Sequence, residues 1–432
     1  MRQAKSERGF TLVELLVVTL IFVMVIVIAG SCFSTLLRYS SRFMKSEESD
    51  LGGVLGLEIL RHDIEQAGFG LPDSYPSTGT PVFAEAAIAP ANTLNDAPSG
   101  VPRALATISS LPVTQITDDA GATYTTIGTN TSLGDYLSIK ASSLGTASAA
   151  QKWAYVTYSS VTTSTNPPKM WASTNANLNN GDTIIALRRS FTATGATNQL
   201  TFNQSTPATY WTTYSATGMP PAFSPNFPHE IVYLYGILSG GGNLRMPFNR
   251  ADFFVATPQT SAMLPQYCAP NTGILYKAMV SQADGNMKFF PLLDCVADMH
   301  VVLGWSLLDS TGNLVTDDTQ TGAGNVDTWT NADGSSVSST SSAVTTSFVK
   351  SALADPGQIK TKLKVVKVYL LAQYGTKDTT YTSPPTFQLY NNSATAEGVI
   401  PGVTFTLSSN MLNYRWKVYR VIVRPENLYA NQ

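Results

Sequence analysis

The sequence predicts an α+β protein, in which a long N-terminal helix packs on a large C-terminal antiparallel β-sheet domain with a β-rich insertion. Three observations predict this fold class. A continuous apolar run occupies residues 10–29. Residues 31–67 contain no proline, and their apolar positions recur at helical spacing. Beyond residue 70, short runs rich in β-branched and aromatic residues alternate with glycine, asparagine, aspartate and proline, which is the pattern of strands and turns.

The composition narrows the class of protein. Of the 432 residues, 43% are hydrophobic and only 13% are charged, whereas about 25% are charged in a typical soluble domain. The 27 basic residues nearly balance the 29 acidic ones, so we expect neither a basic nucleic-acid-binding protein nor an acidic solvating chain. The 18 Phe, 19 Tyr and 6 Trp suffice for a packed core, which excludes disorder throughout the chain.

Residues 10–29 are long and apolar enough to span a membrane. Fifteen of these twenty residues are Phe, Leu, Ile or Val, which favours insertion by roughly 4.5 to 9 kcal/mol. The only charged residue is Glu14, and an acid in mid-membrane costs only about 2.5 to 3.5 kcal/mol. Twenty helical residues cover about 30 Å, the thickness of the hydrocarbon core. The basic flank at residues 1–9 predicts a cytoplasmic N-terminus.

The helix is expected to continue beyond the membrane as an amphipathic segment. Leu57, Leu60, Ile64 and Ala67 form an apolar stripe between charged and polar residues. Residues 52, 53 and 56 are glycines and are expected weak points, because each costs about 1 kcal/mol relative to alanine in a helix.

The junction between the basic flank and the apolar run carries a motif. Residues 9–14 read GFTLVE and resemble the class III leader junction of type IV prepilins and type II secretion pseudopilins. The resemblance implies cleavage after Gly9 by a prepilin peptidase, N-methylation of Phe10, and filament assembly through Thr11 and Glu14. Glu14 would then offset the positive charge of the Phe10 amine, and an acid in hydrocarbon generally marks function. The alternative is a plain signal anchor with Glu14 at the lipid headgroups.

Later segments are similar to PilW-type minor pilins. The similarity is carried by LEILRHDIEQAGFG at residues 57–70, EIVYLYGIL at residues 230–238 followed by GNLR at 242–245, LLDCVADMHVVLGW at 292–305, and YRWKVYRVIVRPENL at 414–428. The closing strand departs from the family's usual Arg-Asn ending, because Pro425 and Glu426 intervene. The similarity covers residues 1–70 and much of 229–428, but not 72–228.

This resemblance implies a minor subunit that primes or caps a type IV pilus and presents a tip adhesin. Its implied partners are prepilin peptidase, other minor pilins and the major pilin. The protein would lie in the inner membrane as a single-pass protein before assembly, and in the periplasmic and extracellular pilus afterwards. The expected domains are a leader at 1–9, a transmembrane assembly helix at 10–30, its amphipathic continuation at 31–70, a variable insertion at 71–228, and a C-terminal β-domain at 229–432 with a low-complexity loop at 311–347.

The three cysteines are expected to differ in role. Cys268 and Cys295 lie in the exported β-region, where an oxidising compartment allows them to pair. A disulfide between them would stabilise the domain by about 3.5 kcal/mol, and the pilin resemblance also suggests a disulfide near the C-terminal part. The alternative is two buried thiols. Cys32 is expected to be a small packing residue.

No motif for catalysis, metal binding or a cofactor stands out, so we expect no enzyme. His62, His229 and His300 have no partner at a metal-ligand spacing. The glycines at 240–242 and 322–324 lack the residues of a phosphate-binding loop. The acidic residues at 317–318 and in 331–334 match a calcium loop incompletely, and solvated turn carboxylates are the other interpretation.

Aromatic residues gather in the Thr/Ser/Asn-rich insertion. In short strands such residues fill a core or, when exposed, stack on sugars or anchor a protein interface; both interpretations stay open. The residues are Trp153, Tyr155, Tyr158, Trp171, Tyr210, Trp211 and Tyr214.

Two rival functions also stay open. The leader motif fits a type II secretion pseudopilin as well as a pilin. A signal-anchored surface adhesin or carbohydrate-binding module is the rival from another class.

Overall fold

A computed structural model gives the fold. It describes residues 12–76, 81–126, 134–158, 166–192, 195–204, 208–260, 264–317, 322–390 and 403–429, with the backbone alone in residues 30–52 and 190–196.

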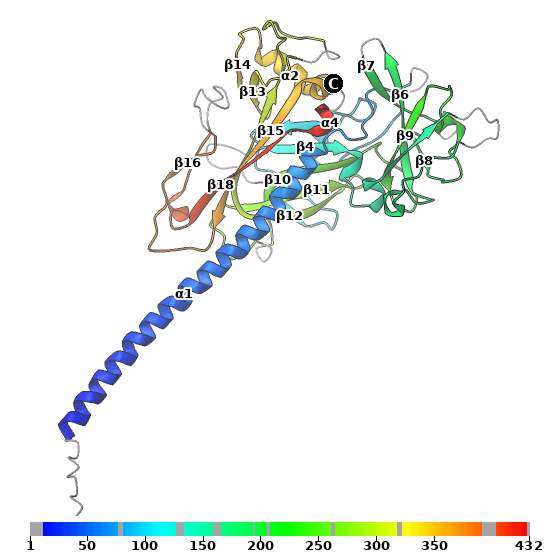
Figure 1. Ribbon diagram of the computed structural model, residues 1–432. Coiled ribbons are helices and arrows are strands. Elements are labelled where there is room, and N and C mark those ends of the chain that lie inside the picture. The colour runs from blue at the N-terminus through cyan, green and yellow to red at the C-terminus, as the bar shows by residue number, and fades with distance from the viewer. Residues whose placement is uncertain are drawn as a thin grey trace, which may run out of the picture.

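One helix, α1 (Leu12–Glu65), leads into a domain built mainly of strands. Its first part projects away from the domain, and its last part lies on a large sheet (Figure 1). The helix of 54 residues runs through all three glycines that were expected to weaken it. The predicted α+β fold, a long helix followed by a large antiparallel β-domain, is confirmed.

The larger sheet has eleven strands and only antiparallel pairings. Its main path is β1-β4-β10-β11-β12-β13-β14, with β15 and β18 branching from β12, and β2 and β3 attached to β10. The strands are β1 (Leu105–Ile108), β2 (Gln115–Thr117), β3 (Thr123–Thr126), β4 (Tyr136–Ala141), β10 (Asn249–Pro258), β11 (Gly273–Val280), β12 (Met287–Trp305), β13 (Thr328–Asn331), β14 (Val337–Ser339), β15 (Leu363–Tyr374) and β18 (Arg415–Val423).

A second sheet of five strands lies beside the first (Figure 1). It comprises β5 (Trp153–Thr157), β6 (Thr183–Thr192), β7 (Gly195–Leu200), β8 (Trp211–Thr213) and β9 (Ile231–Leu238). The order is β5-β9-β6-β7, and β8 pairs with β6. Strands from residues 71–228 therefore contribute to both sheets, and β9 joins a sheet whose other strands precede it.

The remaining elements are short. They are the hairpin β16 (Thr386–Gln388) and β17 (Thr404–Thr406), the helices α2 (Thr346–Ala354), α3 (Pro356–Lys362) and α4 (Glu426–Tyr429), and the 3₁₀ turns at Ala91–Leu94, Ser142–Leu144, Ser148–Gln151, Thr174–Ala176, Pro221–Phe223 and Ser409–Met411.

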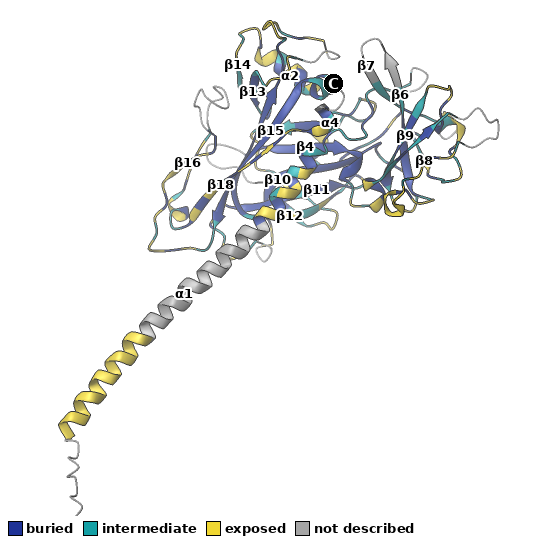
Figure 2. Ribbon diagram, in the orientation of Figure 1, coloured by how far each residue is buried: buried dark blue, intermediate teal, exposed yellow. Residues whose placement is uncertain are grey.

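The main core lies between the large sheet, the end of α1 and the segments around them. Leu60, Ile64 and Ala67, three residues of the predicted apolar stripe, are completely buried in it, and Leu57 packs against its edge. The second sheet has a separate core on one of its faces. Figure 2 shows the exposed beginning of α1 and the mixture of buried, intermediate and exposed residues along its docked end.

Two glycines bring α1 into close contact with β12. A Cβ atom on Gly56 would lie 2.0 Å from the Leu292 carbonyl oxygen, and one on Gly53 would lie 2.8 Å from Cδ1 of Leu293. Since real Cβ atoms do not approach a backbone oxygen so closely, only glycine allows the helix to rest directly on the strand at residue 56.

An ion pair adds to this docking. Nζ of Lys277 on β11 lies 2.5 Å from Oδ2 of Asp63 on α1, and both side chains are largely buried. Burial raises the pKa of the Asp63 carboxyl, and the neighbouring Lys277 opposes that shift. The docked end of α1 is therefore held by apolar burial, by backbone contact and by a charge pair.

A disulfide joins Cys268 to Cys295. It ties the loop before β11 to the middle of β12, so the strand that carries α1 is also covalently linked to the segment before its neighbour. The predicted pairing is thus present.

The substitution Gly56→Ala should destabilise the domain. It places a methyl group against the Leu292 carbonyl and forces α1 away from β12, at a cost of about 1 to 3 kcal/mol that outweighs the helix-propensity gain of about 1 kcal/mol. Thermal unfolding of the detergent-solubilised chain measures this cost. Leu55→Ala is the matched control, because Leu55 is next to Gly56 and 66% exposed. A Gly56→Ala protein as stable as the wild type would show that α1 does not rest on β12.

Candidate processing and assembly site

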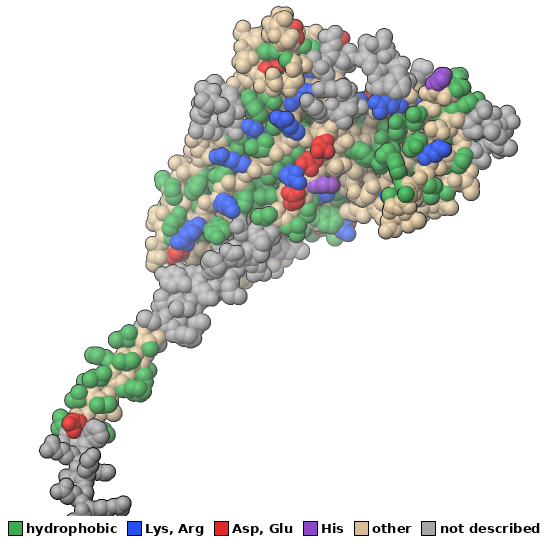
Figure 3. Space-filling model, viewed as in Figure 1, with side chains coloured by type: hydrophobic (Ala, Val, Ile, Leu, Met, Phe, Trp, Pro, Cys, Tyr) green, Lys and Arg blue, Asp and Glu red, His purple; other side chains and the backbone are tan. Residues whose placement is uncertain are grey.

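The N-terminal part of α1 is a continuous apolar surface. Every described residue from Leu12 to Ala29 is exposed, and this stretch is long and apolar enough to cross a membrane. Figure 3 shows this part of the helix covered with hydrophobic side chains. Because exposed apolar surface of this extent is unfavourable in water, the segment requires lipid or other apolar helices around it. The chain is therefore suited to anchoring in a membrane.

Two polar side chains, Thr19 and Glu14, interrupt this surface, and they differ in how their polarity is satisfied. The Thr19 hydroxyl donates a hydrogen bond to the Leu16 carbonyl oxygen at 2.9 Å, so its polarity is satisfied within the helix. Glu14 lies in the first turn of α1, where the positive end of the helix dipole favours an acid. Within the apolar segment, Glu14 is thus the side chain whose charge can attract a cationic group.

The processing residues lie outside the part of the chain that the structure describes. Gly9, Phe10 and Thr11 precede it, and the side chain of Cys32 falls in the stretch where only the backbone is described. Cleavage after Gly9, methylation of Phe10 and the role of Thr11 stay predictions from the motif.

Beyond residue 52, where side chains are described again, the outward face of α1 carries both apolar and charged residues. Val54 and Leu55 are 56% and 66% exposed. One turn later Arg61 forms ion pairs with Glu58 and Glu65, and its Nε lies 2.8 Å from Oε2 of Glu58. Exposed pairs of this kind contribute little to stability.

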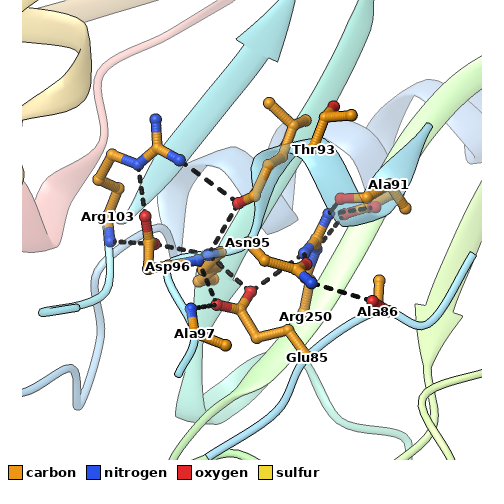
Figure 4. Close-up of polar contacts among 12 residues, drawn as sticks. Glu85, Ala86, Ala91, Thr93, Asn95, Asp96, Ala97, Arg103 and Arg250 are labelled. Carbon is orange, nitrogen blue, oxygen red and sulfur yellow. Dashed lines mark hydrogen bonds and ion pairs between the residues drawn. The ribbon is translucent and has the colours of Figure 1, made fainter. Parts of the chain in front are cut away.

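A buried cluster of charges lies away from α1, and the sequence analysis did not identify it. Glu85, in the segment before the first strand, accepts from Lys140 of β4 at 2.7 Å and from Arg250 of β10 at 3.0 Å (Figure 4). Arg250 also pairs with Asp252 at 2.8 Å. The four side chains are almost completely inaccessible, and mutual compensation accounts for their burial.

Asp96 extends this cluster towards the surface. It pairs with Lys140 at 2.6 Å and with Arg103 at 2.7 Å. Burial opposes ionisation of Asp96, but the two cations outweigh it and hold its pKa below the usual value. Burial likewise lowers the pKa of Lys140, against the opposing influence of Glu85 and Asp96. The cluster fastens the segment around residues 85–103 to β4 and β10. A single charged residue inside an apolar strand, such as Lys140 in YLSIKA, is the sequence feature that could have indicated this buried cluster.

The three histidines lie far from a common site. His62 is exposed on α1, and His229 is exposed before β9. His300 of β12 is buried between two carboxylates, with Nε2 3.1 Å from Asp298 and Nδ1 3.5 Å from Asp135. Among the residues with described positions, no three His, Cys, Asp or Glu side chains are placed to hold a metal ion.

The structure describes one of the two acidic loop segments, residues 331–334, in full, and the other, residues 317–318, only at Asp317. Asp333 accepts a hydrogen bond from the Ser335 backbone at 2.9 Å, the geometry of a turn carboxylate. Asp318 is not among the described residues.

The imidazole of His300 should make the free energy of unfolding decrease as the pH rises into the alkaline range. Burial alone would lower its pKa, but Asp298 and Asp135 outweigh burial and raise the pKa to about 10. Because the folded-state pKa exceeds the ordinary value of about 6.5, the stabilisation is complete below that pH and is lost as the pH rises towards 10.

We therefore expect the melting temperature of His300→Gln to lie furthest below that of the wild type near neutral pH, with the gap narrowing as the pH rises to about 10. His229→Gln, the same change at an exposed histidine, should follow the wild type throughout. A constant gap between His300→Gln and the wild type would contradict a charged imidazole at this position.

The comparisons with known proteins bear on the N-terminus. The family of the prokaryotic N-terminal methylation motif matches residues 4–30, which include the predicted cleavage junction and the whole apolar segment. Comparison with curated proteins and with solved structures found no significant match.

The matched segment and the fold agree. The methylation motif includes the membrane-length part of α1, and this helix continues into a disulfide-linked β-domain. The chain thus carries a prepilin-type N-terminal motif on a helix that is long and apolar enough to anchor it in a membrane.

Proposed function

We propose that this chain is a minor pilin of the PilW type, which primes or caps a type IV pilus after processing by a prepilin peptidase. Its role is assembly, without turnover of a substrate. The observation that carries the proposal is the methylation motif at residues 4–30 placed on a helix whose first part is entirely exposed.

In this proposal the N-terminus faces the cytoplasm and the β-domain lies across the inner membrane until assembly. The three basic residues of the leader favour this orientation. The exposed apolar part of α1 then transfers from lipid to the helical centre of the filament, where other minor pilins and the major pilin surround it. Pairing of Glu14 with the Phe10 amine of the same or a neighbouring subunit removes the cost of an acid in hydrocarbon.

The size of the β-domain supports a minor position. Roughly 360 residues follow α1, and a domain of this size on every subunit would clash in a thin filament. At the tip the domain is free of neighbours on one side, so it can present an adhesin.

The docking of α1 supports the same role. Gly56, Asp63 and the buried residues around them join the helix to the sheet. A movement or load on the helix is therefore transmitted to the domain without an intervening linker.

A type II secretion pseudopilin is the second candidate, because the same motif fits both systems. Deleting the gene separates the two. Loss of surface pili supports the pilin proposal, whereas intact pili with loss of secreted enzymes supports the pseudopilin.

Replacing Glu14 by alanine should leave membrane insertion intact but impair incorporation into pili. The change removes the charge that pairs with the Phe10 amine and makes the segment more apolar, so the membrane fraction keeps the protein. Immunoblots of membranes and of sheared pili measure the two quantities. Thr19→Ala is the matched control on the same helix, because Thr19 is already satisfied by Leu16. Normal amounts of the Glu14→Ala protein in sheared pili would count against the proposal.

A further inference from the structure

The five-stranded sheet has two unlike faces. One face carries the second core, in which Tyr214 and Phe223 are 2% and 1% exposed. On the other face, Trp153 and Tyr155 of the edge strand β5 lie opposite Tyr235 and Tyr233 of β9, and cross-strand partners share a face. All four are half-buried. Tyr235 packs against Phe69 and the main core, whereas Trp153, Tyr155 and Tyr233 lie outside that core and keep accessible surface. Figure 3 shows hydrophobic side chains gathered on the surface of this part of the molecule.

A fifth aromatic residue turns this face into a corner. The Trp171 ring stands at 67° to the Trp153 ring, with 4.7 Å between centroids, and its indole N–H donates to the Trp153 carbonyl oxygen at 2.7 Å. The Tyr155 and Tyr233 rings lie 6.2 Å from Trp171 and Trp153, respectively. The four rings of Trp153, Tyr155, Trp171 and Tyr233 are called the aromatic corner below.

Polar contacts, not core packing, hold Trp171 in place. The buried Asn177 side chain accepts from the Trp171 backbone N–H at 2.6 Å. It also donates to the carbonyl oxygens of Trp171 at 3.0 Å and Ser173 at 3.2 Å. The upright indole is therefore fixed before any ligand arrives, which lowers the entropic cost of binding.

Cationic side chains border the aromatic corner. The backbone N–H of Lys169 donates to the Tyr155 carbonyl oxygen at 2.8 Å; its side chain is exposed and has no ion-pair partner among the described residues. Arg189 lies opposite Ile231, on the same face as Tyr233. The nearby acid Glu230 is paired with Arg188 at 3.1 Å, and Arg188 alternates to the other face. Lys169 thus gives the border of the corner an exposed positive charge.

We propose that the aromatic corner binds an oligosaccharide of uronic acids. A pyranose ring can place its C–H face on one indole and its edge against the other, while its carboxylate is attracted to Lys169. The positive border favours an acidic over a neutral sugar. Nucleic acid fits less well, because affinity for a polyphosphate requires many cations, and the chain has a net charge of −2. This inference does not depend on whether the chain enters a filament.

The test uses the full chain in a zwitterionic detergent that contains no sugar. The probes are hexamers of galacturonate and of alginate, with cellohexaose as the neutral sugar and a ten-residue oligothymidylate as the nucleic acid. Tryptophan fluorescence and calorimetry report binding. We expect at least one uronate hexamer to bind more tightly than cellohexaose and the oligothymidylate, with an affinity that falls as salt is added.

Variants locate the site. Trp171→Ala should weaken uronate binding by about tenfold or more, and Lys169→Gln should reduce the preference over cellohexaose. Tyr267→Ala is the control, because Tyr267 is an exposed aromatic residue (38%) outside the five-stranded sheet. Equal melting temperatures would show that the variants are folded. The proposal is overturned if neither uronate binds at about 1 mM, if cellohexaose or oligothymidylate binds more tightly, or if folded Trp171→Ala binds as the wild type does.

Discussion

The contact between the α1 backbone and β12 is the constraint on which the rest of the structure depends. At Gly56 the helix approaches the Leu292 carbonyl so closely that no side chain fits. This approach buries Leu60, Ile64 and Ala67 in the main core and brings Asp63 to Lys277. The same strand carries Cys295 of the disulfide and His300, which is buried between Asp298 and Asp135. Helix, sheet and covalent link therefore meet on β12.

This arrangement gives one helix two environments. At about 1.5 Å per residue, its 54 residues extend far beyond the β-domain. The docked end has the burial of a core helix, and the projecting end has the exposure of a membrane or filament helix.

Local patterns predicted the parts of the fold that depend on nearby residues. The apolar run, the stripe from Leu57 to Ala67 and the strand-like segments gave the helix and the β-class. The glycines at 53 and 56 allow close contact with β12, which lies more than two hundred residues away in the sequence. Helix propensity does not include this contact, so it predicted only weak points in the helix. Glu85 meets Lys140 and Arg250, which lie 55 and 165 residues later in the sequence, and no local pattern shows that these charges meet. The aromatic residues divided between core and surface according to strand alternation and register, which the sequence did not define.

The mass of the mature N-terminus tests the central claim, that the chain is processed as a filament subunit. Residues 4–30 match the methylation motif, and the exposed apolar end of α1 directly follows the junction. Intact-mass spectrometry of the protein purified from its native membrane should show a chain that begins at a methylated Phe10. A chain that still begins at Met1 would contradict the account.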